Sequence, residues 1–197
     1  MPIDRSPATG PLRLDATGDR LRPARWLPSP NHDRRPPGTV IDLVVIHGIS
    51  LPPGDFGGPW IDALFTNQLD PAAHPDFREL EGLNVSAHLL IRRDGSLTQY
   101  VGFRDRAWHA GRSCFRGRER CNDYAIGIEL EGTDTRPYDV RQYPMLAAVI
   151  AALRRAYPAI TPGRITGHAD IAPGRKTDPG PAFDWDRLYA LLSSSPA

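Results

Sequence analysis

The feature that most limits the fold of this chain is a β-branched run, VIDLVVIH, over Val40–His47. A nearly continuous apolar stretch of this length is typical of a central strand that is buried on both faces. The last residue of the run is a histidine, which would lie where the strand leaves the sheet. The run therefore predicts a sheet covered on both sides, with a polar side chain at one strand end.

A second strand is predicted over Ala125–Glu131, where apolar residues alternate with others. Ile126, Ile128 and Leu130 would face one side, and Glu129 would share the other side with an alanine and a glycine. Small neighbours leave room for a pocket in which the Glu129 carboxylate has a task. The simpler alternative is a glutamate that faces solvent on a half-exposed sheet.

The remaining regular elements follow from turn signals and helical spacing. A hairpin is predicted from two strands around an Asp94-Gly95 turn, Val85–Ile91 and Leu97–Phe103. Helices are predicted at Trp60–Phe65, Asp139–Tyr157 and Trp185–Leu192. Pro144 places the start of the second helix nearer Tyr143, and Asp184 would cap the third. Together these elements indicate an α+β fold, a mixed β-sheet flanked by α-helices, rather than a purely parallel βαβ architecture.

Composition divides the chain into two parts. Residues 1–25 are rich in Pro, Arg, Asp and Gly without apolar periodicity, so we expect a flexible N-terminal extension. The other residues, 26–197, have the make-up of a single globular domain in a chain of 197 residues that is 40% hydrophobic.

Charge and hydropathy exclude several functions. The 24 basic and 23 acidic residues nearly cancel and do not cluster, which argues against nucleic acid as a partner. The sequence contains no run of about eighteen apolar residues, so no membrane span is predicted. The N-terminus also lacks the apolar core of a secretory signal, and we therefore expect a cytoplasmic protein. Two cysteines, Cys114 and Cys121, are too few for a disulfide framework. Nothing demands more than a monomer.

Two histidines and a carboxylate are candidates for a metal site. His47 ends the buried strand, and His168 lies in an irregular polar loop, TGHADIAPGRKTDPG, with Asp178 ten residues further on. Two imidazoles and one carboxylate suit a catalytic zinc ion, which keeps an open position for water. From spacing alone, Asp170 is an alternative ligand, and the short HAD sequence leaves non-haem iron open. A structural role for each histidine is the simpler alternative.

Further polar and aromatic residues could serve such a site. Lys176 is two residues from Asp178 and could aim an ammonium group at it, or could be an ordinary surface lysine. Trp60, Trp108 and Phe56 could pack against a ligand or lie in the core. The other histidines, His32, His74 and His88, are more simply structural or exposed.

Long motifs in a fixed order resemble the 1,6-anhydro-N-acetylmuramyl-L-alanine amidases, the AmpD family. The resemblance starts near Leu27 and leaves out mainly the first 25 residues and the last few. It is carried by VIHGISLPPGDFGGPWIDALF, VSAHLLIRRDG, RAWHAG, GRERCND, IGIELEGTDT and ITGHADIAPGRKTDPGPAFDW. The resemblance implies a mixed sheet flanked by helices, as in amidase-type phage lysozymes and peptidoglycan recognition proteins.

The resemblance also implies particular roles. It implies that zinc is held by His47, His168 and Asp178, which decides against Asp170 and against iron. It further implies that Glu129 handles the proton and that Lys176 steadies the transition state. The implied reaction is hydrolysis of the amide between the lactyl group of muramic acid and L-alanine, in small muropeptides released during cell-wall recycling. Intact peptidoglycan as substrate, or a non-catalytic peptidoglycan-binding protein, are the alternatives.

The resemblance is less direct about the residues that bind the substrate. The resemblance makes Arg120 a candidate for binding a carboxylate, unless it merely pairs with Glu119 or Asp123, and Trp108 and His109 are candidate contacts to sugar or peptide. Two positions depart from the family pattern. Gly48, in the expected substrate-binding set, stands where asparagine is usual, and Asn84 stands where arginine is usual.

Overall fold

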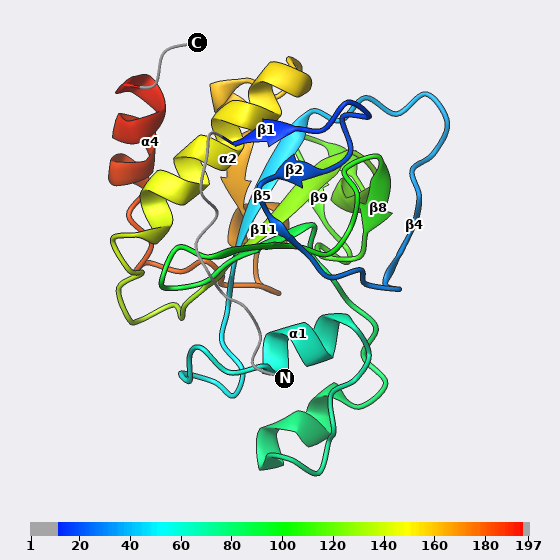
Figure 1. The fold of residues 1–197 in the computed structure, drawn as a ribbon, viewed down its shortest axis with the longest axis vertical. Coiled ribbons are helices and arrows are strands. Elements are labelled where there is room, and N and C mark those ends of the chain that lie inside the picture. Colours follow the sequence, from blue (N-terminus) through cyan, green and yellow to red (C-terminus); the bar gives the residue numbers. More distant parts are fainter. Residues whose placement is uncertain (1–11, 195–197) are drawn as a thin grey trace.

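A computed structural model describes residues 12–194 and centres on a six-stranded mixed sheet (Figure 1). In spatial order its strands are β12 (Ile165–Gly167), β5 (Leu43–Ile49), β11 (Ala125–Glu131), β6 (Leu89–Ile91), β7 (Leu97–Gln99) and β3 (Arg25–Trp26). The order mixes early and late segments, so the centre of the sheet joins parts of the chain that are far apart in sequence.

The two longest strands, β5 and β11, lie side by side and parallel. Leu43, Val44, Val45 and Ile46 have no exposed surface, as expected for a central strand. The strand is shifted from the predicted Val40–His47: it begins at Leu43 and continues to Ile49. The first predicted residue, Val40, is 58% exposed and lies before the sheet.

Strand directions confirm a mixed sheet. β11 is parallel to β5 and β6, β12 is parallel to β5, and β3 is parallel to β7, whereas β6 and β7 are antiparallel. The β6–β7 hairpin is shorter than predicted. Its turn contains Gly95 with φ of 84°, a conformation that glycine adopts without steric cost.

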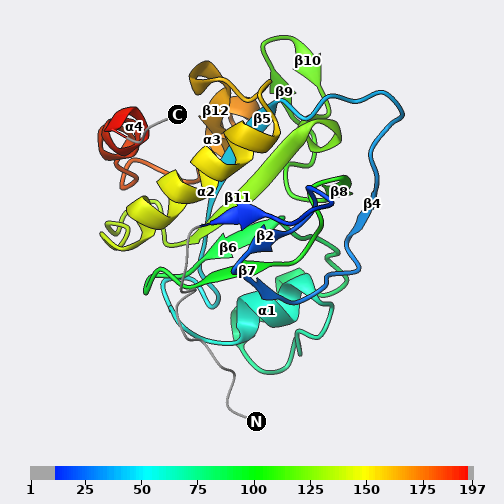
Figure 2. The ribbon, with the colours of Figure 1, turned by 45° about the horizontal axis from the view of Figure 1, so that its top comes forward.

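Helices cover opposite faces of the sheet (Figures 1 and 2). On one face, α2 (Gln142–Ala156) and α4 (Trp185–Ser194) pack over the alternating apolar side chains of β5 and β11. On the other face, α1 (Trp60–Phe65) shares a core cluster with Leu90 and Tyr100. The predicted start of α2 near Tyr143 is confirmed. Asp184 caps α4, because its Oδ1 accepts a hydrogen bond from the Arg187 amide at 2.9 Å.

Shorter elements surround the sheet. Three strand pairs are β1 (Arg13–Leu14) with β2 (Leu21–Arg22), β4 (His32–Arg34) with β8 (Asp105–Ala107), and β9 (Cys114–Phe115) with β10 (Arg118–Glu119). The short helices are η1 (Pro75–Leu80), η2 (Cys121–Asp123), η3 (Pro162–Arg164) and α3 (His168–Ile171). No helix in the described part of the chain has both the length and the apolar composition to cross a membrane.

The prediction of a loose N-terminal extension is wrong for residues 12–25. Leu21 is 1% exposed within the main core, and its amide donates to Gln99 Oε1 at 2.8 Å. The β1–β2 pair thus covers one side of the sheet, although Leu14 and Leu21 are the only apolar residues of these two strands. Residues 1–11, the rest of the predicted extension, lie outside the described residues.

A buried charge network attaches α1 to the sheet. Asp62 accepts from Arg25 at 2.7 Å, from Arg92 at 3.2 Å and from the Tyr100 hydroxyl. Arg92 also donates to Glu131 at 3.0 Å, and Glu131 is 2% exposed. Every carboxylate in this network has a cationic partner, which is what burial of charge requires.

Candidate metal centre and active site

Three chain segments bring the candidate metal ligands together. His47 lies near the end of β5, and His168 directly follows β12 as the first residue of α3. The two strands are parallel neighbours with Gly167 opposite Ile46, so both histidines leave the sheet at the same edge. Asp178 is brought back to this edge by the loop after α3, since its carbonyl accepts from the Ala169 amide at 2.8 Å.

The three side chains converge on one point. His47 Nδ1 is 3.0 Å from His168 Nδ1 and 3.2 Å from Asp178 Oδ2, and His168 Nδ1 is 3.1 Å from the same oxygen. Donors bound at about 2.0–2.1 Å to a tetrahedral ion lie roughly 3.3–3.4 Å apart. The observed triangle is close to this size, so these residues could hold a metal ion.

The protonation states suit a cation. Burial lowers the pKa of His47 to about 4, so its ring is neutral at pH 7. Burial alone would raise the pKa of Asp178, but the contacts with the His168 and His47 rings outweigh it and hold that pKa well below its usual range. The anionic carboxylate of Asp178 and the neutral ring of His47 therefore face each other at neutral pH.

The alternative ligand, Asp170, is used elsewhere. Its Oδ2 accepts from the Gly167 amide and from the Thr166 hydroxyl, both at 2.8 Å. These bonds satisfy backbone and side-chain donors at the start of α3. Asp170 is therefore a helix-capping residue, and Asp178 is the carboxylate that meets the histidines.

Each histidine also makes a hydrogen bond with its second ring nitrogen. His168 Nε2 is 3.1 Å from the Ala110 carbonyl, and His47 Nε2 is 2.9 Å from His109 Nδ1. A carbonyl can only accept, so His168 carries its proton on Nε2 and presents a lone pair at Nδ1. The Nδ1 atom that faces Asp178 and His47 is thus free to bind a cation.

Glu129 lies beside this cluster, opposite His47 in the β5–β11 register. Its Oε2 is buried and has no hydrogen-bond partner among the described residues. Burial, and then the charge of Asp178, raise the pKa of Glu129 well above its ordinary value, while the charge of Lys176 opposes the rise. Glu129 lines a cavity and not the open surface of the sheet, but Ala125 and Gly127 are not part of that cavity wall, and the His109 ring fills the space beside Gly127.

This site cavity has a volume of about 620 Å³. All three candidate ligands line it, together with Glu129 and the exposed Lys176. The other residues of its wall are Gly48, Ile49, Leu64, Phe65, Leu83, Asn84, Val85, Ser86, Ala87, Trp108, His109, Ala110, Gly111, Asn122 and Arg175. Of the predicted substrate contacts, Trp108, His109 and Gly48 lie in this wall.

Gly48 has a structural reason to be a glycine. A Cβ at this position would overlap the hydroxyl of Tyr138, whose ring is buried. Tyr138 donates to the Pro179 carbonyl at 2.9 Å, next to Asp178. The missing side chain at position 48 therefore makes room for a tyrosine that holds the segment carrying the candidate aspartate ligand.

Arg120 is not part of the cavity wall. Its backbone is left-handed, with φ of 59°, and its 68% exposed side chain pairs with Asp123 at 2.9 Å. The structure thus favours the simpler interpretation of Arg120. The guanidinium that does line the cavity is that of Arg175, which donates to the carbonyls of Ala110 at 2.6 Å and Arg112 at 2.7 Å. Its position directly before Lys176 in the GRKTDPG loop was the available sequence signal.

The remaining aromatic and histidine candidates lie outside the cavity wall. Trp60 packs on Phe77 with ring centroids 5.2 Å apart, and Phe56 lies under two arginines. His88 is fully buried and accepts from the Gly127 amide at 3.0 Å, and His74 caps η1. Each of these side chains therefore makes contacts within the protein, outside the wall of the site cavity.

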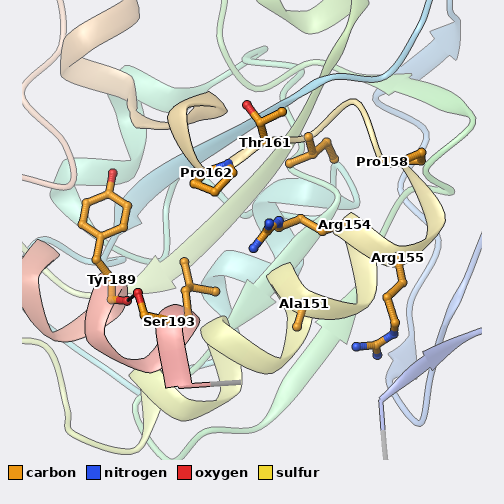
Figure 3. Close-up of a pocket in the computed structure, with 10 residues that line it drawn as sticks. Ala151, Arg154, Arg155, Pro158, Thr161, Pro162, Tyr189 and Ser193 are labelled. Atoms are coloured by element: carbon orange, nitrogen blue, oxygen red, sulfur yellow. Dashed lines mark hydrogen bonds between the residues drawn. The ribbon is translucent and has the colours of Figure 1, made fainter. Parts of the chain in front are cut away.

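A second cavity of about 580 Å³ lies away from this site (Figure 3). It is formed by the C-terminal part of α2, the loop that follows and the outer turns of α4, and Arg154 points into it (Figure 3). The residues that line it are Ala151, Arg154, Arg155, Pro158, Ile160, Thr161, Pro162, Tyr189, Leu192 and Ser193. None of them is a histidine, a cysteine or a carboxylate residue. It has no group that could bind a metal ion or handle a proton at neutral pH.

Two histidines at the ends of neighbouring parallel strands and an aspartate from the loop after α3 lie beside a buried carboxylate, and this arrangement, which could hold a metal ion, suits a hydrolase. The chain belongs to the N-acetylmuramoyl-L-alanine amidase family, whose model matches residues 37–181. The prediction of family and fold class is thereby confirmed.

Individual relatives agree with this assignment. The chain is 63% identical to the 1,6-anhydro-N-acetylmuramyl-L-alanine amidase AmpD of Enterobacter cloacae over 87% of this chain and 91% of that protein. A crystal structure of a selenomethionine AmpD derivative superposes with a TM-score of 0.87 at 60% identity, over 91% of this chain and 98% of that one. The Escherichia coli amidase AmiD in complex with anhydro-N-acetylmuramic acid-L-Ala-D-γ-Glu-L-Lys superposes with a TM-score of 0.57 at 29% identity. The superposition covers 80% of this chain and 60% of that one.

Proposed function

We propose that this protein is a zinc-dependent amidase that hydrolyses the bond between the lactyl group of 1,6-anhydro-N-acetylmuramic acid and L-alanine in small muropeptides. The observation that carries the proposal is the triangle of His47, His168 and Asp178 donor atoms, 3.0 to 3.2 Å apart, beside the unpaired carboxylate of Glu129. The AmpD relatives, named for this activity, support the choice of substrate.

Zinc is the ion that this donor set suits. Two imidazoles and one carboxylate are a common catalytic zinc set, and a zinc ion held there would supply Lewis acidity toward the attacking water and the scissile carbonyl. The carboxylate ligand makes the set anionic, which offsets part of the charge of the ion. The residues present therefore fit the metal that the family resemblance implies.

Glu129 is the proton carrier in this proposal. Its carboxylate accepts a proton from water as the water oxygen adds to the lactyl carbonyl carbon. It then returns this proton to the alanine nitrogen as the carbon–nitrogen bond breaks, which leaves a lactyl carboxylic acid and a free peptide amine. Its carboxylate has no structural hydrogen bond to break at Oε2, so the group is available for both transfers.

Lys176 supports the same step by charge. The carbonyl oxygen becomes negative as water adds, and an ammonium group in the cavity wall stabilises that charge. Lys176 is also close enough to Glu129 for its charge to oppose the rise in the pKa of Glu129. It therefore favours the ionised carboxylate that accepts the proton.

Substrate binding is assigned to the cavity wall. Trp108 offers an aromatic face to sugar or peptide, and Gly48 leaves backbone accessible at the rim of the metal ligands. Arg175 and Lys176 are the cations of this wall and suit the peptide carboxylates. Arg120, tied to Asp123, is at most an outer contact.

We further propose that the protein acts in the cytoplasm, as a monomer, on fragments returned by cell-wall recycling. The support is the likeness to the AmpD relatives, whose name denotes an amidase of the anhydro sugar. Cell fractionation and measurement of the molecular mass in solution test these two points separately from the chemistry.

The central experiment measures zinc content and amidase activity on the same sample. The purified protein should hold about one zinc ion and convert an anhydro-muropeptide to free peptide. Glu129→Gln and Lys176→Met should lower kcat by about 100-fold to 10,000-fold and about 100-fold to 1,000-fold, respectively, with zinc retained. Arg154→Met, which removes one of the two arginines of the second cavity, is the matched control and should act like the wild type.

Two results would contradict the proposal. A pure protein that binds no zinc and releases no peptide would point to a non-catalytic peptidoglycan-binding protein. Faster release from intact sacculi than from anhydro-muropeptides, at matched concentrations of the scissile bond, would keep the chemistry and change the substrate to intact peptidoglycan.

A further inference from the structure

His109 occupies an unusual place next to the candidate metal centre. Its Nδ1 lies 2.9 Å from His47 Nε2, and the two rings meet edge to face with centroids 5.0 Å apart. His47 therefore uses both ring nitrogens, because its Nδ1 faces His168 and Asp178. One of the two nitrogens of His109 is committed to another histidine and not to the open cavity.

The direction of this hydrogen bond follows from the metal site. A cation at the triangle needs a lone pair on His47 Nδ1, so the proton of the neutral His47 ring lies on Nε2. His47 Nε2–H then donates to His109 Nδ1, which accepts. For His168 the equivalent partner is the Ala110 carbonyl. Each histidine ligand thus has an acceptor behind it, but one acceptor is a backbone group and the other is a replaceable side chain.

The surroundings hold the His109 ring in place. Asn122 Oδ1 accepts from the amides of His109 at 3.2 Å and Ala110 at 2.7 Å, which fixes the backbone of this segment. A Cβ on Gly127 would overlap the His109 ring, so the strand β11 provides space for the ring by lacking a side chain there. The position of the acceptor is therefore determined by two separate segments, η2 and β11.

We infer that His109 is a positioning residue for the metal ligand His47: it accepts the Nε2 proton, and so fixes the tautomer and ring orientation that present Nδ1 to the metal. The inference rests on the proposed function, since it assumes that the triangle binds zinc. It gives His109 a task different from the substrate contact that the sequence suggested. Loss of such an outer hydrogen bond weakens metal binding by about 10-fold to 100-fold.

The test compares two substitutions that differ in one property. His109→Asn keeps an acceptor oxygen near the place of Nδ1, whereas His109→Leu keeps similar bulk without an acceptor. Zinc dissociation constants are measured by competition with a chromophoric chelator, after thermal unfolding of the zinc-free proteins has shown that each variant folds. His109→Leu should bind zinc 10-fold to 100-fold more weakly, and His109→Asn should stay within a few-fold of the wild type.

Two controls complete the design. His74→Leu removes an exposed histidine far from the ligands in the fold and should not change zinc affinity. Gly127→Ala should move the His109 ring and weaken zinc binding with His109 itself intact.

Several outcomes would overturn the inference. These are equal zinc affinity in His109→Leu and wild type, equal losses in the Asn and Leu variants, or a raised KM with unchanged zinc affinity, which would mark a substrate contact. In all three cases an active, zinc-binding wild type would leave the proposed function standing. A wild type that binds no zinc would overturn the proposed function first.

Discussion

The protein has two cavities of nearly the same size, about 620 Å³ and about 580 Å³, and only one of them is equipped for chemistry. The site cavity lies where the parallel strands β5 and β12 end, so side chains from distant segments converge there. The second cavity lies between helices α2 and α4 and the loop that follows α2 (Figure 3). Volume therefore does not identify the site; convergence of strand ends does.

The charged groups of the two cavities also differ in their structural setting. Glu129 Oε2 is buried without a partner on a central strand, where no local structure explains a carboxylate. Arg154 lies in the last turn of α2, where a cation interacts favourably with the helix dipole. The arginine has a structural reason to be where it is, whereas the described residues offer no structural partner for Oε2 of the glutamate.

The largest expected difference between the cavities concerns the metal. Removing zinc with a chelator should lower amidase activity by about 1,000-fold or more, because Lewis acidity contributes several kcal/mol, and added zinc should restore it. Ala151→Phe, which fills part of the second cavity, should leave kcat/KM within about two-fold. If filling the second cavity abolished turnover while zinc content stayed normal, the assignment of the site would be reversed.

The second-largest expected effect is on stability, and it distinguishes Glu129 from Glu131, which lies on the same face of β11. Glu131→Gln should lower the free energy of unfolding by about 3 kcal/mol, since Arg92 would lose a buried charged partner. Glu129→Gln removes an unpaired carboxylate and should not destabilise the protein. Urea unfolding of the zinc-free proteins measures both, and equal losses would show that Glu129 is also structural.

A smaller effect is expected at the rim of the site cavity. Gly48→Ala should cost about 1–3 kcal/mol of stability, because its Cβ overlaps the Tyr138 hydroxyl. Removing that hydroxyl in the double variant Gly48→Ala/Tyr138→Phe should recover part of the loss. Thermal unfolding of the single and double variants gives the coupling, and purely additive losses would contradict the predicted overlap.

The smallest effect is a pH dependence. The raised pKa of Glu129 means that the folded, zinc-free protein holds a proton that the unfolded chain releases near pH 4.5. Stability from this group is present below that pH and is lost as pH rises through the folded-state pKa. Glu129→Gln should therefore gain about 1 kcal/mol over the wild type between pH 4 and pH 8.

Arg154→Gln in the second cavity is the control for this measurement and should track the wild type across the range. A Glu129→Gln variant whose stability also ran parallel to the wild type would show that the pKa of Glu129 is not raised.

Much of the fold could be predicted because its signals are local. The apolar run before His47, the alternation in Ala125–Glu131 and the Asp184 cap each reflect residues near one another in sequence. Residues 12–25 could not be predicted in this way. Leu21 packs into the core and its amide bonds Gln99, a partner 78 positions away, so its order comes from a distant strand.

The candidate site shows the same limit. Spacing alone could not choose between Asp170 and Asp178, because the choice depends on Asp170 bonding the start of α3. Arg120 was assigned by motif, but its left-handed backbone directs it to Asp123. The hydrogen bond between His109 and His47 joins a loop residue to a strand residue 62 positions away, and no sequence pattern links the two positions. Such contacts exist only once the sheet is assembled.

The wide spacing of the proposed ligands has a consequence for how the protein is made. His47 and His168 are 121 positions apart, and Asp178 follows ten positions later, so the last donor is synthesised long after the first. A nascent chain that stops short of Asp178 offers two imidazoles and no carboxylate. Tight zinc uptake should therefore begin only after the final ligand has left the ribosome, and bound zinc then marks polypeptides whose synthesis and folding have passed that point.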